Sequence, residues 1–544
     1  MTSGNKQSLT WVPLALAAAL IAGILIGSHF TAQRSSELDR KLNNVLGIVS
    51  NEYVDAVNMD SLVERSIPEI LANLDPHSIY FSEKDLQVAN EELSGSFSGI
   101  GISFQVMEDT INVIEVIPGG PSEKVGILTG DKIVSVDGKS FVGERINPNM
   151  VREQLRGAKG SVVRLGIKRN NSDKPVYFNV TRGDIPLKSV DAAYMIEKNV
   201  GYVKVNQFGR TTYNEFVAGL AKLKTQGAKH FIIDLRGNGG GYMEMAILMV
   251  NEFLPANQLI VSTKGRYKRD DSEVWSDGNG AYQDEELVVL IDEFSASASE
   301  IFAGAIQDND RGLIVGCRSF GKGLVQKQFP LPDNSAIRLT IARYYTPSGR
   351  CIQKDYKSKD GLLVYDKELF DRYNTGELYN KDSIKIDKSK IFKTSQGRTV
   401  YGGGGIIPDI FVAKDTSGIT SYYIAVINAG LPQQYALKYV QRNERTLSKV
   451  KDYKQLLRLL NDNQALLNDF VTFSSQHGVP ARWYYIDQSR EFILTDLKAI
   501  IARDLLGQDA FYPIFNRTDR TIAAALKAIG KHQAKFPITS NDIH

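Results

Sequence analysis

Short apolar runs alternate with helix-like segments through the middle of this chain, and most of the runs end in glycine or polar turn residues. Apolar runs bounded by turn signals are typical of buried strands, and strands that alternate with helical patterns indicate a sheet with parallel units. We therefore expect an α/β core. Its predicted strands are 200–205, 231–233, 287–291 and 313–315. Its predicted helices are 213–223, 242–253 and a segment that begins at Glu300.

An uncharged apolar run from Trp11 to Phe30 precedes this core. About 20 apolar residues are enough to span a bilayer as a helix. The end of the run, 28–33, matches the small-residue cleavage site of a signal peptide poorly. We therefore expect residues 1–33 to form a cytoplasmic tip and an uncleaved transmembrane anchor, with the rest of the chain outside the cytoplasm. Secretion after cleavage of a signal peptide is the alternative.

The chain has 544 residues, which is too long for one core, and we expect two to four domains. Helix-like spacing of apolar residues predicts an N-terminal helical segment over 36–93 and a C-terminal helical domain over 417–544. The composition, 42% hydrophobic and 23% charged, is that of a globular protein. The net charge of +3 is too small to indicate nucleic-acid binding.

Residues 96–182 combine strand patterns with glycine-rich turns. Gly99-Ile100-Gly101-Ile102 leads into the first strand pattern, and further strand and turn signals follow. This run resembles bacterial PDZ domains. The resemblance implies that Gly99, Ile100, Gly101 and Ile102 bind the end of a peptide: backbone donors would hold its C-terminal carboxylate while the peptide pairs with the strand edge.

A glycine-rich turn, 237–241, follows the predicted strand 231–233 and leads into a predicted helix. Backbone N–H groups in such a turn, with a helix N-terminus behind them, form a concavity that binds anions. The turn is compatible with an oxyanion hole, with a phosphate cradle, or with a tight packing turn between a strand and a helix.

Nucleophilic chemistry is suggested by Ser295, Ser297 and Ser299, which follow one predicted strand, and by Lys322, which follows the next. The carboxyl ends of strands are where chemistry sits in α/β sheets. A serine needs a base to take its proton, and no histidine here lies in a turn that would present it. A lysine serves as base when burial lowers its pKa. The spacing alone does not select one of the serines.

Both motifs also have structural explanations. Ser297-Ala298-Ser299-Glu300 matches a helix capping box, and a lysine between glycines is usually a solvated turn. Gln326 follows Lys322 by four residues and would orient its amine if this segment is helical or tightly turned. The capping interpretation is favoured when the serines are considered by themselves.

Taken together, the motifs at 234–241, 295–301 and 319–326 resemble the C-terminal processing peptidases, also called tail-specific proteases. The similarity covers roughly residues 40–415. It implies a peptidase core over 186–415, with an insertion over 354–400 that departs from the compact family core. One further departure is Gly239, where the family often carries proline.

The resemblance also implies the roles of individual residues. Ser297 is the nucleophile, Lys322 the general base and Gln326 the residue that positions the lysine. The backbone N–H groups of Gly240 and Ala298 form the oxyanion hole.

The expected protein is a hydrolase with a multidomain α/β architecture: an α+β serine protease core that contains parallel-sheet units, an inserted β-rich PDZ domain, an N-terminal transmembrane helix and a C-terminal helical domain. It would cleave proteins with accessible C-terminal tails in the periplasm, anchored in a bacterial inner membrane, and it requires no cofactor and no metal. A homo-oligomer or an adaptor protein is a possible partner, and no nucleic acid is expected. The alternative is a PDZ adaptor that binds C-termini without cutting them.

Overall fold

The computed structural model describes residues 17, 19, 21, 37–107, 109–143, 146–169, 174–356, 361–534 and 537. The chain folds as two compact units, Met1–Leu74 and Asp75–His544. The first unit contains α2 (Glu37–Glu52) and α3 (Met59–Ala72). The predicted helical segment 36–93 is interrupted by the short strand β1 (Ile79–Phe81), after which α4 (Glu83–Ser94) follows. The aspartate–proline turn before β1 explains the break, because proline disfavours helix in the residue that precedes it.

Among the residues that the model describes, no helix is both long and apolar enough to cross a bilayer. The predicted anchor at 11–30 lies outside these residues, apart from Ala17, Ala19 and Ile21.

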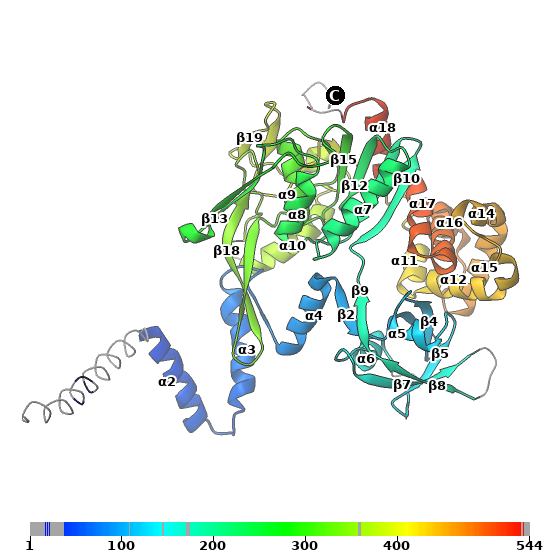
Figure 1. The fold of residues 1–544 in the computed structure, drawn as a ribbon, viewed down its shortest axis with the longest axis horizontal. Helices are drawn as coiled ribbons and strands as arrows, with labels where there is room; N and C mark the ends of the chain where they lie inside the picture. Colours follow the sequence, from blue (N-terminus) through cyan, green and yellow to red (C-terminus); the bar gives the residue numbers. More distant parts are fainter. Residues whose placement is uncertain are drawn as a thin grey trace, which may run out of the picture. The chain divides into compact units, whose positions relative to one another are not determined.

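A six-stranded sheet forms the centre of the second unit (Figure 1). Its strands, in spatial order, are β10 (Val190–Glu197), β11 (Val200–Val205), β12 (His230–Asp234), β15 (Glu286–Ile291), β16 (Leu313–Gly316) and β21 (Ile410–Phe411). Only the β10–β11 pair is antiparallel; the strands from β11 to β21 run parallel. The α/β core with parallel units is therefore confirmed.

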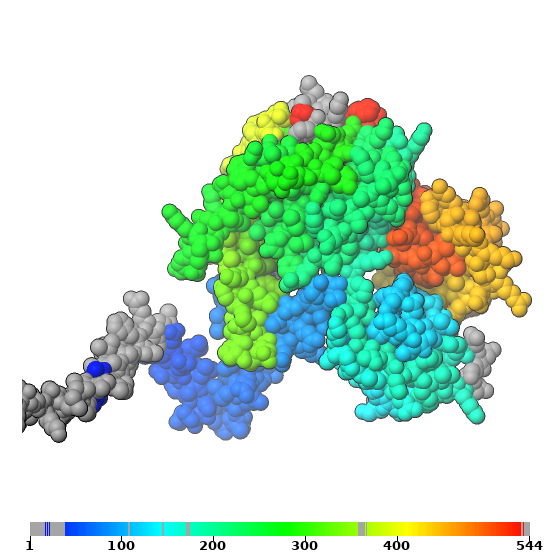
Figure 2. Space-filling view, viewed as in Figure 1, coloured from blue at the N-terminus to red at the C-terminus, as the bar shows by residue number. Residues whose placement is uncertain are grey.

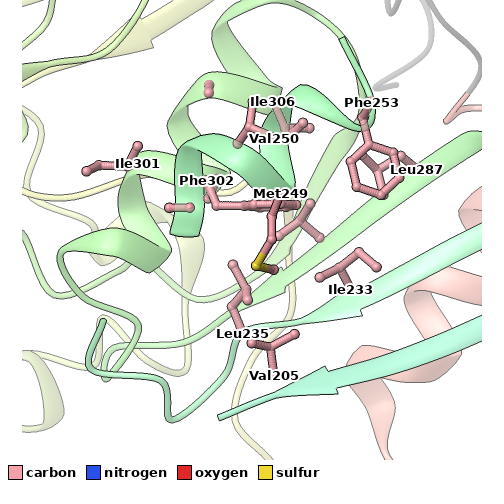
Figure 3. Packing of buried hydrophobic residues seen from close by; sticks show 14 of the residues in the cluster. Val205, Ile233, Leu235, Met249, Val250, Phe253, Leu287, Ile301, Phe302 and Ile306 are labelled. Carbon is pink, nitrogen blue, oxygen red and sulfur yellow. The ribbon is translucent and has the colours of Figure 1, made fainter. Parts of the chain in front are cut away.

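Alternation along the strands divides the core into two faces, because successive strand residues point to opposite sides. Ile233 and Leu287 pack against three helices on one face (Figure 3). These helices are α7 (Thr212–Thr225), α8 (Met243–Asn251) and α9 (Ala298–Asp308). Ile232 and Val288 point to the other face and pack against α18 (Arg520–Gly530).

A second sheet is antiparallel and lies beside the core. Its central strand is β18 (Ala336–Tyr345), which pairs with β17 (Leu324–Pro330), β1 and β13 (Leu259–Gly265). The edge strand β14 (Ser272–Trp275) pairs with β13. This sheet matters for function because β17 begins directly after the predicted catalytic lysine.

The PDZ segment has its own antiparallel sheet and its own apolar core. Its strands are β3 (Ile102–Met107), β4 (Thr110–Val116), β5 (Lys132–Val136), β6 (Lys139–Ser140), β7 (Val162–Lys168) and β8 (Val176–Thr181), and its helices are α5 (Pro121–Val125) and α6 (Pro148–Leu155). The strands β2 (Ser96–Gly99) and β9 (Gly183–Pro186) pair with each other at its entry and exit. This pairing identifies the segment as an insertion into the surrounding chain.

The C-terminal region is helical, as predicted. One apolar cluster joins α11 (Ser421–Asn428), α12 (Leu431–Arg442), α13 (Glu444–Leu447), α14 (Tyr453–Leu459), α15 (Asn463–Gln476), α16 (Trp483–Leu506) and α17 (Tyr512–Phe515). Their outer side chains form the continuous orange to red-orange surface on the right of Figure 2. The last helix, α18, packs on the central sheet instead of in this cluster, because its apolar face meets the sheet face that α7, α8 and α9 leave open.

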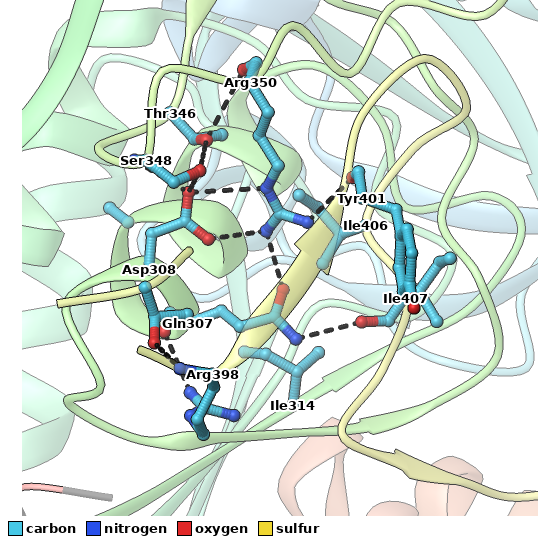
Figure 4. Close-up of polar contacts among 12 residues, drawn as sticks. Gln307, Asp308, Ile314, Thr346, Ser348, Arg350, Arg398, Tyr401, Ile406 and Ile407 are labelled. Atoms are coloured by element: carbon cyan, nitrogen blue, oxygen red, sulfur yellow. Dashed lines mark hydrogen bonds and ion pairs between the residues drawn. The ribbon is translucent and has the colours of Figure 1, made fainter. Parts of the chain in front are cut away.

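The predicted insertion 354–400 contains α10 (Gly361–Asn374), β19 (Ile391–Lys393) and β20 (Thr399–Tyr401). Two buried arginines, one before the insertion and one near its C-terminal end, connect the β20 region to the end of α9 (Figure 4). Arg350 donates to Asp308 at 2.7 Å and to the Tyr401 carbonyl at 3.0 Å. Arg398 donates to the Gln307 carbonyl at 3.0 Å. The insertion is thus tied to the helix that begins next to Ser297.

Candidate active site

Ser297 lies in the turn between β15 and α9, directly before the first residue of the helix. Its backbone has φ 55° and ψ −111°, a region that residues with a Cβ rarely adopt. Such a conformation costs about 1–3 kcal/mol and is retained where function needs it. Among the serines of this motif, the structure distinguishes Ser297 clearly. Ser295 and Ser299 are fully buried and donate to the carbonyls of Leu235 and Asn238.

Ser297 opens into a cleft of about 930 Å³. The cleft is lined by the glycine-rich turn, by β17 and by α4. Residues on its wall include Asn90, Leu93, Gly239, Gly240, Gly241, Tyr242, Ser297, Ile301, Lys322, Leu324, Gln326 and Arg338. The structure therefore brings Ser297, Lys322, Gln326 and Gly240 to one cavity, as the sequence predicted. The contribution of α4 was not predicted.

Lys322 lies between β16 and β17, and its amine donates to the side-chain carbonyl oxygen of Gln326 at 3.0 Å. Burial lowers the pKa of Lys322 to about 8, and the nearby positive charge of Arg338 acts in the same direction. An amine with this pKa is partly neutral near physiological pH. It can therefore accept a proton, as a general base must.

Gln326 lies on the strand β17, so its contact with Lys322 does not depend on the helical or tightly turned segment that the sequence analysis named as its condition. The contact with Lys322 forms nevertheless, because the lysine lies in the loop that precedes the strand. The amide nitrogen of Gln326 donates to the carbonyl of His77 at 2.7 Å. This bond orients the amide so that its oxygen faces the lysine. The sequence analysis missed His77, which lies 249 residues away and has no local signal of its role.

Glu300 connects the two halves of the site. Its carboxylate accepts from the backbone N–H groups of Ser297 at 2.9 Å, Gly321 at 2.7 Å and Lys322 at 2.8 Å. The hydroxyl of Tyr344 donates to the carbonyls of Ser297, at 3.1 Å, and of Lys322, at 2.7 Å. The predicted capping box is therefore formed through the bond from the Ser297 N–H to the Glu300 carboxylate. It also fixes the lysine loop.

The two N–H groups predicted to form the oxyanion hole differ in whether they already have a hydrogen-bond acceptor. The N–H of Ala298 has no hydrogen-bond acceptor in the described part of the chain. The N–H of Gly240, in contrast, donates to the side-chain oxygen of Asn238 at 2.9 Å. Gly240 nevertheless lies against the turn that carries Ser297: a Cβ at this position would be 2.8 Å from the Cβ of Ser297 and 3.0 Å from the Ala298 nitrogen.

The predicted PDZ contacts lie where β2 passes into β3. Gly99 ends β2, and Ile102 begins β3, which is at the edge of the PDZ sheet. Gly101 has φ 76°, a conformation that glycine adopts without strain. The side chain of Ile100 is only 2% exposed and belongs to the PDZ core. Ile100 therefore contributes backbone groups to this edge, and its side chain does not face it.

Three family models match this chain. Peptidase family S41 matches residues 199–360, and the PDZ domain matches residues 98–180. A family of unknown function matches residues 422–507 in the C-terminal helices.

Several curated relatives also match this chain. A carboxy-terminal-processing protease of Bartonella bacilliformis is 38% identical over 338 residues, which are 61% of this chain and 76% of the relative. The carboxy-terminal processing protease CtpB of Bacillus subtilis is 33% identical over 366 residues, which are 66% of this chain and 74% of the relative. A solved photosystem II D1 C-terminal processing protease is 27% identical; the match covers 58% of this chain and 91% of that structure, with a TM-score of 0.33.

Proposed function

This chain belongs to the carboxy-terminal processing proteases of peptidase family S41 and is a serine-type endopeptidase; we propose that Ser297 is its nucleophile and Lys322 its general base. The observation that supports this most strongly is the amine of Lys322. It is held by Gln326 in the cleft that Ser297 lines, and burial lowers its pKa to about 8.

In the acylation step, the neutral amine of Lys322 takes the proton of the Ser297 hydroxyl while Oγ attacks the peptide carbonyl carbon. The negative charge that develops on the carbonyl oxygen faces the N–H of Ala298. The N–H of Gly240 joins it when the substrate oxygen replaces the side chain of Asn238 as its acceptor. The lysine then gives its proton to the leaving amine as the C–N bond breaks, which leaves an ester on Ser297.

In the deacylation step, the same amine takes a proton from water, and the resulting hydroxide equivalent attacks the ester. The ester bond breaks, the lysine returns the proton to Ser297, and the new C-terminus departs. The bond from Lys322 to Gln326 keeps the amine in one position through both steps. Because the base is already held in place, less conformational entropy is lost when the transition state forms.

The PDZ domain supplies substrate recognition in this proposal. β3 is the first strand of its sheet and pairs with β4 alone among the described strands, so its outer edge is open to an added peptide strand. A protein C-terminus that pairs there would place its carboxylate at the backbone of residues 99–102. The preceding part of the same polypeptide would then reach the cleft.

We also propose a location for the enzyme. The uncharged segment 11–30 supports an anchor in a bacterial inner membrane, with the protease on the periplasmic side. Cell fractionation with protease protection tests this. Recovery of the full-length chain in the cytosolic fraction would contradict it.

The experiment for the catalytic assignment is cleavage of a loosely folded protein with an apolar C-terminus, followed by mass spectrometry of the fragments. The parent enzyme is expected to cut, whereas Ser297→Ala and Lys322→Ala are expected to be inactive. Ser299→Ala is a matched control, because its buried hydroxyl lies outside the cleft wall. Cutting that survives in both Ser297→Ala and Lys322→Ala would overturn the dyad. Tail binding without any cutting by the parent would favour the adaptor.

A further inference from the structure

The insertion 354–400 packs directly behind the catalytic lysine. Helix α10 supplies two buried side chains, Tyr365 and Arg372, that approach the lysine loop and its supports. The match to peptidase family S41 ends at residue 360, before this helix begins. The contacts below are therefore specific to a part of the chain that the family model leaves out.

Arg372 is 2% exposed and holds the backbone that leads to Lys322. Its guanidinium donates to three successive carbonyls, those of Arg318 at 3.2 Å, Ser319 at 2.8 Å and Phe320 at 3.1 Å. A planar guanidinium presents several N–H donors in fixed directions, so one side chain can fix the path of a loop. The last of these carbonyls belongs to Phe320, two residues before Lys322.

Tyr365 reaches the lysine by a second route. Its hydroxyl lies 2.6 Å from Nε2 of His77, and the two rings pack edge to face. The carbonyl of His77 in turn accepts from the amide of Gln326, which holds the Lys322 amine. A chain of hydrogen bonds therefore runs from α10 to the general base. Burial and the neighbouring Lys322 lower the pKa of His77 to about 4, so the histidine is neutral in the working range of the enzyme.

Charge pairs keep α10 in this place. Arg318 forms buried hydrogen bonds with Glu377, at 2.5 and 2.7 Å. Glu368 on α10 accepts from Lys354 at 3.2 Å and from Arg318 at 3.3 Å. Lys354 also lies 4.0 Å from the ring centre of Phe320 and 4.1 Å from that of Tyr365. The opposite end of the insertion is anchored to α9 by Arg398, and Arg350, which precedes the insertion, bonds to both Asp308 of α9 and the Tyr401 carbonyl (Figure 4).

We propose that the insertion positions the general base: Arg372 fixes the loop that carries Lys322, and Tyr365 acts through His77 to hold Gln326 against the lysine amine. This inference rests on the proposed role of Lys322. Neither Tyr365 nor Arg372 contacts the reacting atoms, and both are positioning residues. The insertion is thus part of the catalytic machinery by its contacts, although it supplies no reacting group.

The test compares Tyr365→Phe with Tyr435→Phe in the full-length protein. Each change removes only a hydroxyl from a tyrosine that is almost fully buried; in the control, that hydroxyl donates to Asp469 at 2.8 Å within the C-terminal helices. Each preparation is labelled to completion with a fluorophosphonate, which reacts with the active serine. The amount of label counts the folded active sites. We expect Tyr365→Phe to lower kcat per labelled site by about fivefold, with KM unchanged, because one net hydrogen bond is lost from the positioning chain. Tyr435→Phe should leave kcat per labelled site unchanged.

Arg372→Lys and Arg372→Met form a second pair. Lysine keeps the charge but cannot reach three carbonyls at once, so the expected order of kcat per labelled site is parent, Arg372→Lys, Arg372→Met. A purely structural role would lower the number of labelled sites and leave kcat per site unchanged, which would overturn the inference. An unchanged kcat per labelled site in Tyr365→Phe would overturn the role of Tyr365, which acts through His77 and Gln326. If cutting survives in both Ser297→Ala and Lys322→Ala, the proposed dyad itself is wrong, and this result is distinguishable from the failure of either positioning route.

Discussion

The carboxylate of Glu300 accepts the backbone N–H of Lys322 at 2.8 Å, although the two residues lie on different elements of the fold. The same carboxylate accepts the N–H of Ser297, so one fully buried side chain sets the spacing between Ser297 and Lys322, the proposed nucleophile and base. Every hydrogen-bond partner of this carboxylate is a donor: three backbone N–H groups and the hydroxyl of Ser319.

Glu300→Gln is therefore expected to reduce both activity and stability. The amide retains one acceptor but directs an NH₂ group at backbone donors, which leaves buried polar groups unpaired at a cost of about 1–3 kcal/mol each. We expect kcat to fall at least tenfold, by about 1.4 kcal/mol or more of transition-state stabilisation. Ser319→Ala removes one donor to the carboxylate and the acceptor of the Ile406 N–H, but it keeps the bonds from Glu300 to Ser297 and Lys322, so its effect on kcat should be smaller. Urea unfolding and kcat would be measured together, and an unchanged kcat in Glu300→Gln would contradict the clamp.

The activity should rise with pH through the pKa of Lys322, about 8. Below this value the amine is an ammonium and cannot take the serine proton; above it the base is free. Stability should also rise with pH. The pKa of the lysine is about 8 in the folded protein and 10.5 in the unfolded chain, so the buried ammonium destabilises the fold below pH 8. This cost disappears as the pH rises from 8 toward 10.5. The measurement is kcat/KM between pH 6 and 9.5. A flat profile would rule out this base, and Lys322→Arg, which stays charged, should be inactive at every pH.

Gly240→Ala should abolish most activity. Its φ of 105° disfavours any Cβ, and the new methyl group would lie 2.8 Å from the Cβ of Ser297 and from the Ala296 carbonyl oxygen. Gly237 provides a matched control in the same turn, since its φ is 71° but no atom lies within 4 Å of an added Cβ. We expect a loss of at least 100-fold in kcat for Gly240→Ala. For Gly237→Ala we expect a stability loss of about 1 kcal/mol, with activity kept. Equal effects on kcat would argue against a crowded catalytic turn.

Asp519 connects the C-terminal region to the glycine-rich turn. It pairs with Arg236 at 2.7 Å, and it also caps α18 by accepting from the N–H of Thr521 at 2.8 Å. Asp519→Asn keeps the cap and removes the charge, whereas Asp519→Ala removes both. We expect the free energy of unfolding to fall by about 1–2 kcal/mol in Asp519→Asn, and by about 1 kcal/mol more in Asp519→Ala.

Thermal unfolding with limited proteolysis of the C-terminal helices would measure these losses. Equal losses in the two Asp519 variants would mean that the cap contributes nothing. No loss in Asp519→Asn would mean that the ion pair with Arg236 is not stabilising.

The sequence by itself determined the elements of the core and the family. The apolar runs around Ile233 and Leu287 became strands of a parallel sheet, because such runs have to be buried on both faces. The glycines of 237–241 marked the turn beside the nucleophile, since a close approach of backbone to backbone admits no Cβ. These features depend on neighbours along the chain and are therefore visible in it.

Only the tertiary structure decided which groups meet in the cleft. The alternating serines are equivalent by spacing, and burial of Ser295 and Ser299 in hydrogen bonds to distant carbonyls distinguishes Ser297. The bond between Gln326 and His77 joins residues 249 positions apart, and the contact of His77 with Tyr365 joins residues 288 apart. A hydrogen bond between such distant positions requires no local pattern at either end. Its existence depends on packing of the whole unit, and for this reason the role of the insertion did not emerge before the fold was known.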